Sequence, residues 1–437
     1  MNKLIFFLAI VLLSGCSLNS NSKFWSPEEN VNQEILINEN NIKQGIFKED
    51  KVYKKDFNEN LKININGKIQ TNQRLINYTN NNGVNNFNSN LKKSSRYKFS
   101  KIKNFYNYEP EILFIKENII FFNNKGTVLK FNKNSKLTWK KNIYSKSEKK
   151  LNPVLQFAGN DQYLIVADNV AKYYKIKIEN GELVWSKNNI APFNSQIKIF
   201  KDKFFIVDYS NTLRCYSIKN GEELWNIKTD NSLIRSQKKL SLVIVNNTIL
   251  FNNSIGDITA VNADTGELLW QLPTQTSLVY ESTFSLESSD IITDSKNLFF
   301  SNNKNQFFSI DINTGSLNWK TKINSNLRPT LIDNILLTIS LEGYLFVIDK
   351  NNGNIIRSTY LFDKFKEKKR SSIKPTGFIL GNKKLYLSTN IGRLLVVDFT
   401  IGRTEKVLKI DNQKILRPVI SNEKLFIVKD NSIIKIY

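Results

Sequence analysis

The sequence predicts an all-β fold: an eight-bladed β-propeller of four-stranded antiparallel blades, with the N- and C-terminal strands sharing the closing blade. Two observations lead to this prediction. A short phrase recurs seven times along the chain, and its turn positions are 46, 40, 45, 49, 38 and 49 residues apart. This period is typical of a four-stranded propeller blade. In addition, the end of the chain stops one strand short of a complete unit.

The phrase is an apolar strand, a turn residue and, in its full form, a tryptophan four residues after a glycine. Its full copies are IKIENGELVW (176–185), CYSIKNGEELW (215–225), AVNADTGELLW (260–270) and SIDINTGSLNW (309–319). Weaker copies are KFNKNSKLTW (130–139), VIDKNNGNIIR (347–357) and VVDFTIGRTEK (396–406). Ser135 replaces the glycine in the first of these, and Arg357 and Lys406 replace the tryptophan in the other two.

The repeated residues have a structural interpretation. A glycine after Asn or Asp suits a tight turn with positive φ, and a tryptophan at the start of each outer strand is expected to wedge against the neighbouring blade. The alternative, a row of ligand-stacking platforms, is disfavoured because the spacing is so regular. The glycines are Gly181, Gly221, Gly266, Gly315, Gly353 and Gly402, and the tryptophans are Trp139, Trp185, Trp225, Trp270 and Trp319.

Each period holds four short β-rich runs separated by turns. One unit reads LRPTLID (327–333), ILLTISL (335–341), YLFVID (344–349) and IIRSTYL (355–361). The last 22 residues, LRPVISNEKLFIVKDNSIIKIY, supply only three strands, and their Arg417-Pro418 aligns with Arg328-Pro329 and Lys374-Pro375. The segment SRYKFSKIK (95–103) alternates as a strand does, so we expect it to supply the missing outer strand.

Three regions are expected: a signal peptide at 1–15, a flexible Asn/Lys-rich tether at 16–94 and the propeller at 95–437. Lys3 precedes the apolar run LIFFLAIVLL (4–13), which is too short for a permanent membrane span. LLSGC (12–16) resembles the lipobox of bacterial lipoproteins. The resemblance implies that Cys16 is diacylated, and Ser17 after it implies export to the outer membrane, facing the periplasm. The alternative is an ordinary signal peptide with an incidental cysteine.

With Cys16 acylated, Cys215 has no partner for an intramolecular disulfide, and we interpret it as a small buried residue. The formal net charge is +24. That charge is either compositional, since Lys, Asn and Ile are abundant throughout, or attracts anionic lipid or an acidic partner. The export signal argues against nucleic acid as a partner.

Catalytic, metal and cofactor sites are not indicated. The chain has no histidine, which removes the imidazole base, the histidine metal ligand and the conventional catalytic triad. No P-loop or dinucleotide fingerprint occurs. Carboxylates such as Asp349 lie at turns of the repeat, where blade geometry explains them.

The strand, Asp/Asn-x-x-Gly and tryptophan pattern resembles the pyrroloquinoline-quinone-like propeller repeat family. Joined to a lipobox, it resembles the lipoprotein scaffolds of the machinery that assembles β-barrels in the bacterial outer membrane. This implies a non-enzymatic monomer within a larger complex, bound to the periplasmic domains of the central barrel-assembly protein. Two alternatives stay open: a quinone-dependent dehydrogenase, which cofactor absorbance or Ca²⁺-dependent dye reduction would reveal, and a scaffold for other envelope proteins.

The resemblance also implies a docking surface made by two connections between blades. The first is NSLIRSQ (231–237), where Leu233, Ile234 and Arg235 match the family's pattern. The second is STFSLESSD (282–290), where Glu287 or Asp290 is the acidic candidate, although the family's Asp-x-Asp is not reproduced. The alternative for Arg235 is a solvated loop cation.

Overall fold

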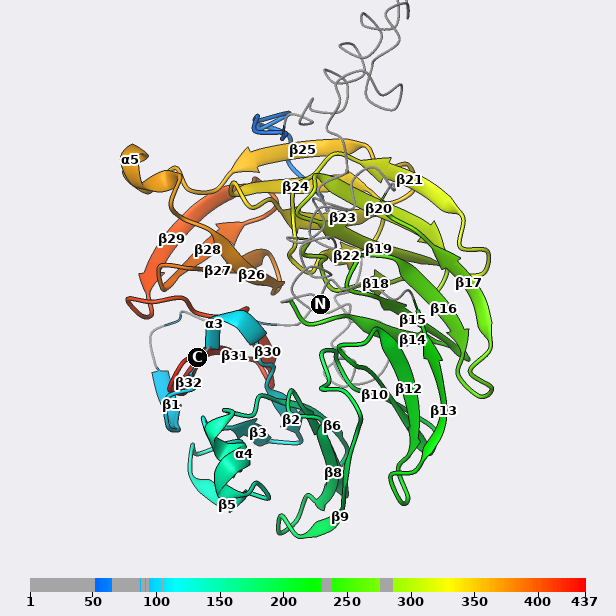
Figure 1. Ribbon diagram of the computed structural model, residues 1–437. Coiled ribbons are helices and arrows are strands. Elements are labelled where there is room, and N and C mark those ends of the chain that lie inside the picture. The colour runs from blue at the N-terminus through cyan, green and yellow to red at the C-terminus, as the bar shows by residue number, and fades with distance from the viewer. Residues whose placement is uncertain are drawn as a thin grey trace, which may run out of the picture. The chain divides into compact units, whose positions relative to one another are not determined.

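The computed structural model describes residues 52–64, 87, 91, 94–103, 105–229, 238–275 and 286–437. Within these residues the strands form eight four-stranded antiparallel sheets, arranged as the blades of a propeller (Figure 1). In each blade the first strand lies innermost and the fourth lies at the rim. The sequence prediction of an eight-bladed propeller is therefore confirmed.

The blades follow one another in chain order. Blade 1 holds β2 (Leu113–Ile115), β3 (Asn118–Phe122), β4 (Val128–Phe131) and β5 (Leu137–Lys141); blade 2 holds β6 (Leu155–Gly159), β7 (Tyr163–Asp168), β8 (Lys172–Lys177) and β9 (Leu183–Asn188). Blade 3 holds β10 (Lys198–Phe200), β11 (Lys203–Val207), β12 (Thr212–Ser217) and β13 (Glu223–Lys228); blade 4 holds β14 (Leu242–Val245), β15 (Thr248–Asn252), β16 (Ile258–Asn262) and β17 (Leu268–Leu272). Blade 5 holds β18 (Ile292–Thr293), β19 (Asn297–Asn302), β20 (Gln306–Asp311) and β21 (Leu317–Thr321); blade 6 holds β22 (Thr330–Ile332), β23 (Ile335–Ile339), β24 (Tyr344–Asp349) and β25 (Ile355–Tyr360). Blade 7 holds β26 (Pro375–Leu380), β27 (Lys384–Thr389), β28 (Arg393–Asp398) and β29 (Arg403–Lys409).

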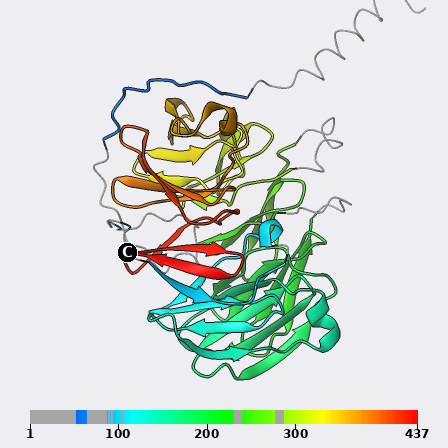
Figure 2. The ribbon, with the colours of Figure 1, turned by 90° about the vertical axis from the view of Figure 1, so that its left-hand side faces the viewer.

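Blade 8 joins the two ends of the propeller, as the sequence predicts. It holds β30 (Val419–Ser421), β31 (Lys424–Lys429), β32 (Ser432–Ile436) and, at the rim, β1 (Ser94–Lys98). β1 pairs antiparallel with β32 from Ser94 opposite Ile436 to Lys98 opposite Ser432. Figure 2 shows the blue strand β1 beside the red strands of the chain's end. Tyr97 of β1 is buried, and its ring lies 5.6 Å from that of Phe131 in blade 1.

Tryptophan and glycine lock each of the first five blades to the next. Every tryptophan ring of the repeat packs on the turn glycine of the following blade, where a methyl group would collide with it: a Cβ on Gly221 would lie 2.8 Å from Trp185. Gly221 also has a φ of +72°, which favours glycine. In four of the five pairs the indole N–H donates to the backbone carbonyl three residues before that glycine, at 2.8 to 3.3 Å.

Arg357 does in blade 6 what tryptophan does in the earlier blades. Its side chain is fully buried, and Nη2 donates to the carbonyl of Phe399, three residues before Gly402 of blade 7. Nη1 donates to the carbonyls of Thr400, at 2.7 Å, and Leu61, at 2.8 Å. An arginine makes several such bonds where an indole makes one, so Arg357 also holds the segment that contains Leu61.

That segment, residues 52–64, lies along the rim of blade 6. Phe57 exchanges two backbone hydrogen bonds of 3.0 Å with Ser358 of β25, and the amide of Ile63 donates to the carbonyl of Thr400 at 2.8 Å. Ile63 is buried against blades 6 and 7. This part of the region expected to be a tether is thus attached to the propeller, and we call residues 52–64 the strap.

We predict that Arg357→Ala costs about 3 kcal/mol of unfolding free energy, because it leaves a cavity between blades and unpaired carbonyls. Hydrogen exchange at the amide of Ile63 should accelerate as the strap opens. Arg357→Trp is the informative control. It restores the contact used in the other blades but not the hydrogen bond to Leu61, so the propeller should recover its stability while the strap stays open. Unchanged exchange at Ile63 in both variants would contradict the role of Arg357.

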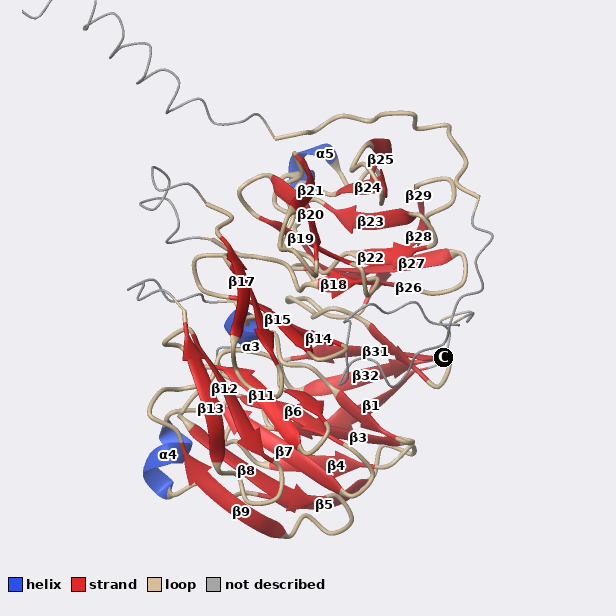
Figure 3. Ribbon diagram, turned by 90° about the vertical axis from the view of Figure 1, so that its right-hand side faces the viewer, coloured by secondary structure: helices blue, strands red, loops and turns tan. Residues whose placement is uncertain are grey.

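Three short helices accompany the strands in the described residues: α3 (Phe105–Tyr108), α4 (Lys146–Lys150) and α5 (Glu367–Arg370) (Figure 3). The described part of the chain has no helix with the length and apolar character needed to span a bilayer. Cys215 lies fully buried in β12, and burial raises the pKa of its thiol to about 12. This confirms its interpretation as a small buried residue.

Candidate functional site: a charged ring in the central channel

The eight inner strands place one equivalent residue each around the central channel. In every blade a turn of two residues joins the first strand to the second. Counting back four residues from the residue just before this turn gives the same position in each blade. We call these eight residues the ring. In blade order they are Glu111, Gln156, Gln196, Ser241, Asp290, Arg328, Gly377 and Arg417.

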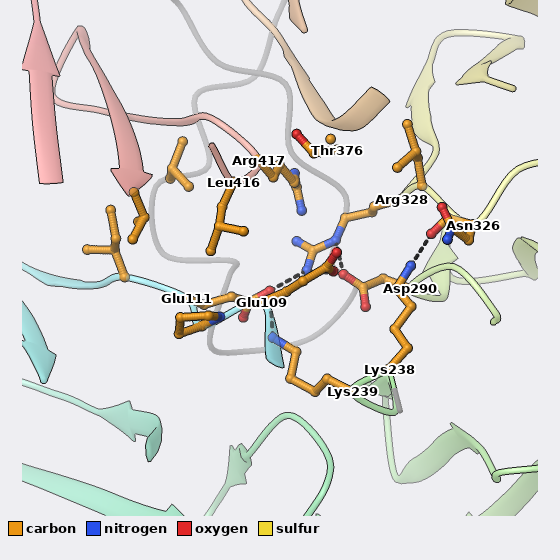
Figure 4. Close-up of a pocket in the computed structure, with 16 residues that line it drawn as sticks. Glu109, Glu111, Lys238, Lys239, Asp290, Asn326, Arg328, Thr376, Leu416 and Arg417 are labelled. Carbon is orange, nitrogen blue, oxygen red and sulfur yellow. Dashed lines mark hydrogen bonds and ion pairs between the residues drawn. The ribbon is translucent and has the colours of Figure 1, made fainter. Parts of the chain in front are cut away.

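Five ring residues line a single cavity of about 80 Å³ (Figure 4). They are Glu111, Asp290, Arg328, Gly377 and Arg417. Lys238 and Lys239, which precede β14, also line it, together with Glu109, Asn326 and Thr376. Glu111, Gln156 and Gln196 line a smaller neighbouring cavity. The ring thus divides into two arcs. The uncharged arc consists of Gln156, Gln196 and Ser241, and the charged arc runs from Asp290 through Arg328, Gly377 and Arg417 to Glu111.

Arg328 is the centre of the charged arc. Its Nε donates to Oδ2 of Asp290 at 2.5 Å, and its Nη2 lies 2.9 Å from Oε1 of Glu111. Nζ of Lys239 lies 3.1 Å from the same Glu111 oxygen. The Arg328 side chain is only 5% exposed, so these pairs are screened little by solvent.

The carboxyl groups stay ionised in this arrangement. Burial would raise the pKa of Glu111, but Lys239 and Arg328 outweigh burial and lower it to about 2. Burial likewise opposes ionisation of Asp290, yet Arg328 and Lys239 hold the pKa of that carboxyl well below its usual range. The charged arc is therefore a network of true ion pairs.

Arg417 enters the cavity from the connection between blades 7 and 8. Its Nε donates to the carbonyl of Phe378 at 3.2 Å. Its stem passes so close to Gly377 that a Cβ there would lie 2.4 Å from Cβ of Arg417, so the glycine makes room for the arginine. Among the described residues no carboxylate lies within ion-pair distance of Arg417. Burial, then Arg328, lowers its pKa to about 9.

Lys198, on β10 of blade 3, is fully buried. Burial, then the positive charge of Arg328, lowers its pKa to about 7. No group of three or more histidine, cysteine or acidic side chains in the described part of the chain is placed to hold a metal ion.

The predicted docking residues divide into two groups. Leu233, Ile234 and Arg235 lie outside the described residues. Glu287 is half-buried and accepts a hydrogen bond from Asn326, whereas Asp290 belongs to the ring and pairs with Arg328. Both predicted connections lead directly into the charged arc, because Lys238 follows the first and Asp290 ends the second.

A wide groove between blades 2 and 3 reaches the end of β13. It has a volume of about 570 Å³, and its walls include Tyr173, Tyr216 and Lys228, the last residue of β13. Ile190 at its edge is 93% exposed. An isoleucine this exposed, beside a groove lined with tyrosines, is suited to protein contact.

Sequence reasoning did not identify the ring as a site. The Arg-Pro pair before the inner strands aligns Arg328 with Arg417 and points to this position in two blades, but the same alignment selects Lys374, three residues before the ring residue Gly377 of blade 7. Glu111 has no such neighbour, since Ile112 stands where the proline would be. The ring appears only when the registers of all inner strands are compared.

Comparisons with known proteins agree with the fold. The family model described as outer membrane protein assembly factor BamB matches residues 124–359. The crystal structure of BamB from Moraxella catarrhalis is similar at 13% identity over 79% of this chain and 97% of that chain, with a TM-score of 0.60. None of the curated protein sequences matches the chain.

Two other solved structures share the architecture. The computationally designed Ika8 protein has 13% identity, a TM-score of 0.58, and coverage of 78% of this chain and 99% of that chain. Saccharomyces cerevisiae Sqt1 has 12% identity, a TM-score of 0.57, and coverage of 82% and 99%. Likenesses at such low identity establish the fold alone.

Proposed function

The chain belongs to the outer membrane protein assembly factor BamB family, and from this premise we propose that it is a non-enzymatic scaffold of the β-barrel assembly machinery. The match over residues 124–359, which runs from blade 1 through most of blade 6, carries the proposal. In this role the propeller docks the periplasmic domains of the central barrel-assembly protein and supports the folding and insertion of outer membrane proteins. Cys16 carries the lipid that anchors it to the outer membrane.

The docking surface in this proposal is formed by the connections 231–237 and 282–290 between the blades. Leu233 and Ile234 supply an apolar anchor, and Arg235 donates charge-assisted hydrogen bonds to a partner carboxylate or carbonyl. The exposed Ile190 and the groove that ends at Lys228 extend the same surface.

The acidic part of the surface is assigned to Glu287 rather than Asp290. Asp290 is held by Arg328 and contributes to the partner only by fixing the end of its connection. Glu287 is engaged by the neutral side chain of Asn326, which a partner cation can outcompete.

Arg235→Glu tests the docking surface. We expect the tagged variant, purified from gently solubilised envelopes, to lose the barrel-assembly protein, because arginine hot spots contribute about 2 kcal/mol or more, roughly thirtyfold in affinity. Arg403→Glu is the matched control, since Arg403 is exposed on β29 of the distant blade 7. A folded Arg235→Glu protein that retains its partner at the wild-type yield would refute this surface. If no barrel-assembly protein accompanies even the unmodified protein, the scaffold role itself is wrong.

A further inference from the structure

The cavity at the charged arc is lined by more positive than negative side chains. Four cations line the cavity: Lys238, Lys239, Arg328 and Arg417. Two carboxylates, Glu111 and Asp290, face them, while the third carboxylate nearby, Glu109, lies 3.6 Å from a further cation, Lys414. We propose that the cavity is a binding site for an oxyanion, a carboxylate or phosphate group, held by Arg417 together with Arg328 and Lys239.

Arg417 is the primary ligand in this proposal. Figure 4 shows its guanidinium directed into the pocket beside that of Arg328. The hydrogen bond from Nε to Phe378 fixes the plane of the guanidinium, and the remaining nitrogens present the fork that carboxylates and phosphates accept. Because the described carboxylates pair with other cations, an anion bound here would meet an arginine that needs a counter-charge.

The surroundings of Arg417 are built to admit it. Gly377 is the one ring residue without a side chain, and the strand β26 bulges between Pro375 and Gly377. Any larger residue at Gly377 would collide with the stem of Arg417. The gap in the ring and the arginine that fills it are therefore one structural feature, which produces a half-buried cation at the wall of a cavity.

The size of the cavity limits the ligand. Its volume of about 80 Å³ is several times the roughly 10–15 Å³ that a cavity needs to hold one water molecule. One carboxylate or phosphate group fits this space, and a larger molecule would insert only such a group. Two neighbouring guanidinium groups repel each other, and an anion between them offsets that repulsion, in accord with the lowered pKa of Arg417.

The oxyanion has two potential sources, a free solute or a carboxyl group at the end of a polypeptide that reaches the channel. This inference rests on the ring and does not depend on the scaffold role.

Calorimetric titration of the full-length protein in detergent tests the site, with sodium acetate and inorganic phosphate as probes and sodium chloride at equal ionic strength as the reference. We expect saturable binding of at least one oxyanion, and a corresponding rise in melting temperature, since the ligand binds only the folded state. Arg417→Gln should raise the dissociation constant about tenfold or more, since charge-assisted hydrogen bonds are lost. Glutamine keeps the Cβ and Cγ that pack on Gly377.

Arg403→Gln makes the same chemical change on the surface of β29 and should leave the dissociation constant unchanged. Arg417→Lys retains the charge without the fork, so its affinity should be intermediate. An acetylated tripeptide with a free C-terminal carboxylate, compared with its amide, identifies the source: tighter binding than acetate indicates a polypeptide end, and equal binding a free solute. The proposal is overturned if neither anion binds above the chloride reference, or if a folded Arg417→Gln protein binds as the unmodified protein does.

Discussion

Replacing Ser94–Lys98 by a Gly/Ser segment of equal length will lower the unfolding temperature of the propeller and broaden its unfolding transition. These five residues form β1, whose pairing with β32 joins the N-terminal side of blade 1 to the last residues of the chain. Without them, β32 has an unpaired edge and the propeller is not closed between blades 8 and 1. Keeping the length constant leaves the linkage between the strap and blade 1 unstretched.

The expected loss is large because β1 supplies packing as well as pairing. Tyr97 is 1% exposed and sits between Phe131 of blade 1 and Phe426 of blade 8, with ring centroids 5.6 and 6.3 Å away. Removing an aromatic side chain of this burial alone costs about 3–5 kcal/mol. Thermal unfolding followed by circular dichroism should show a lower and broader transition, with aggregation through the exposed edge.

The same Gly/Ser replacement at residues 70–74, within the segment that the sequence predicts to be a tether, serves as the control, and its melting temperature should stay close to that of the unmodified protein. Equal stability of the two variants would show that blade 8 does not need its fourth strand. That result would contradict the closure of the ring by the two ends of the chain.

The sequence was informative about the blades because their construction is repeated. The repeated phrase marks the third strand, the turn and the fourth strand of seven units, with both the glycine and the tryptophan in four of them, and an incomplete last unit reveals the shared blade. These are local patterns, each within about 25 residues, so they can be recognised without knowing how the blades are arranged.

The substitution at Arg357 could not be interpreted in the same way. In the sequence it is only a place where tryptophan is missing. Its role depends on a carbonyl 42 residues later, Phe399, and on another 296 residues earlier, Leu61. Such contacts between distant segments follow from the closed ring and leave no local signal.

The ring is unpredictable for a related reason. Its members come from eight segments, and their side chains differ in size, charge and polarity, so no residue type marks the position. What they share is their place four residues before the turn-side end of the first strand pair, which can be located only when the pairing register of that blade is known. The sequence therefore placed Asp290 in a docking connection, while the structure shows its carboxylate bound to Arg328.

Arg328→Met should destabilise the propeller by about 3–5 kcal/mol near neutral pH, the cost of breaking a buried ion pair by removing one partner. The variant leaves Asp290 and Glu111 facing each other across a cavity, with Lys239 as the closest remaining cation to Glu111. Methionine fills part of the arginine's volume, so the loss is mainly electrostatic. Chemical denaturation at about pH 7.5 measures it directly.

The pH dependence distinguishes this electrostatic effect from a loss of packing. In the unmodified protein the pKa of Glu111 is lowered to about 2, so its stabilising contribution is present above the unfolded-state pKa and is lost as the pH falls toward 2. Without Arg328, its strongest opposing charge, burial raises the pKa of Asp290, whereas Lys239 still stabilises the ionised form of Glu111. Asp290 in the folded variant therefore takes up its proton at a higher pH than in the unfolded chain. The stability deficit of Arg328→Met should therefore shrink between about pH 7.5 and pH 5.

Arg393→Met is the matched control, because the guanidinium of Arg393 donates to the backbone carbonyls of Ile391 and Asp411, and its deficit should stay constant over this range. If the loss of unfolding free energy in Arg328→Met is equally independent of pH, Arg328 stabilises the propeller by packing and not by its charge.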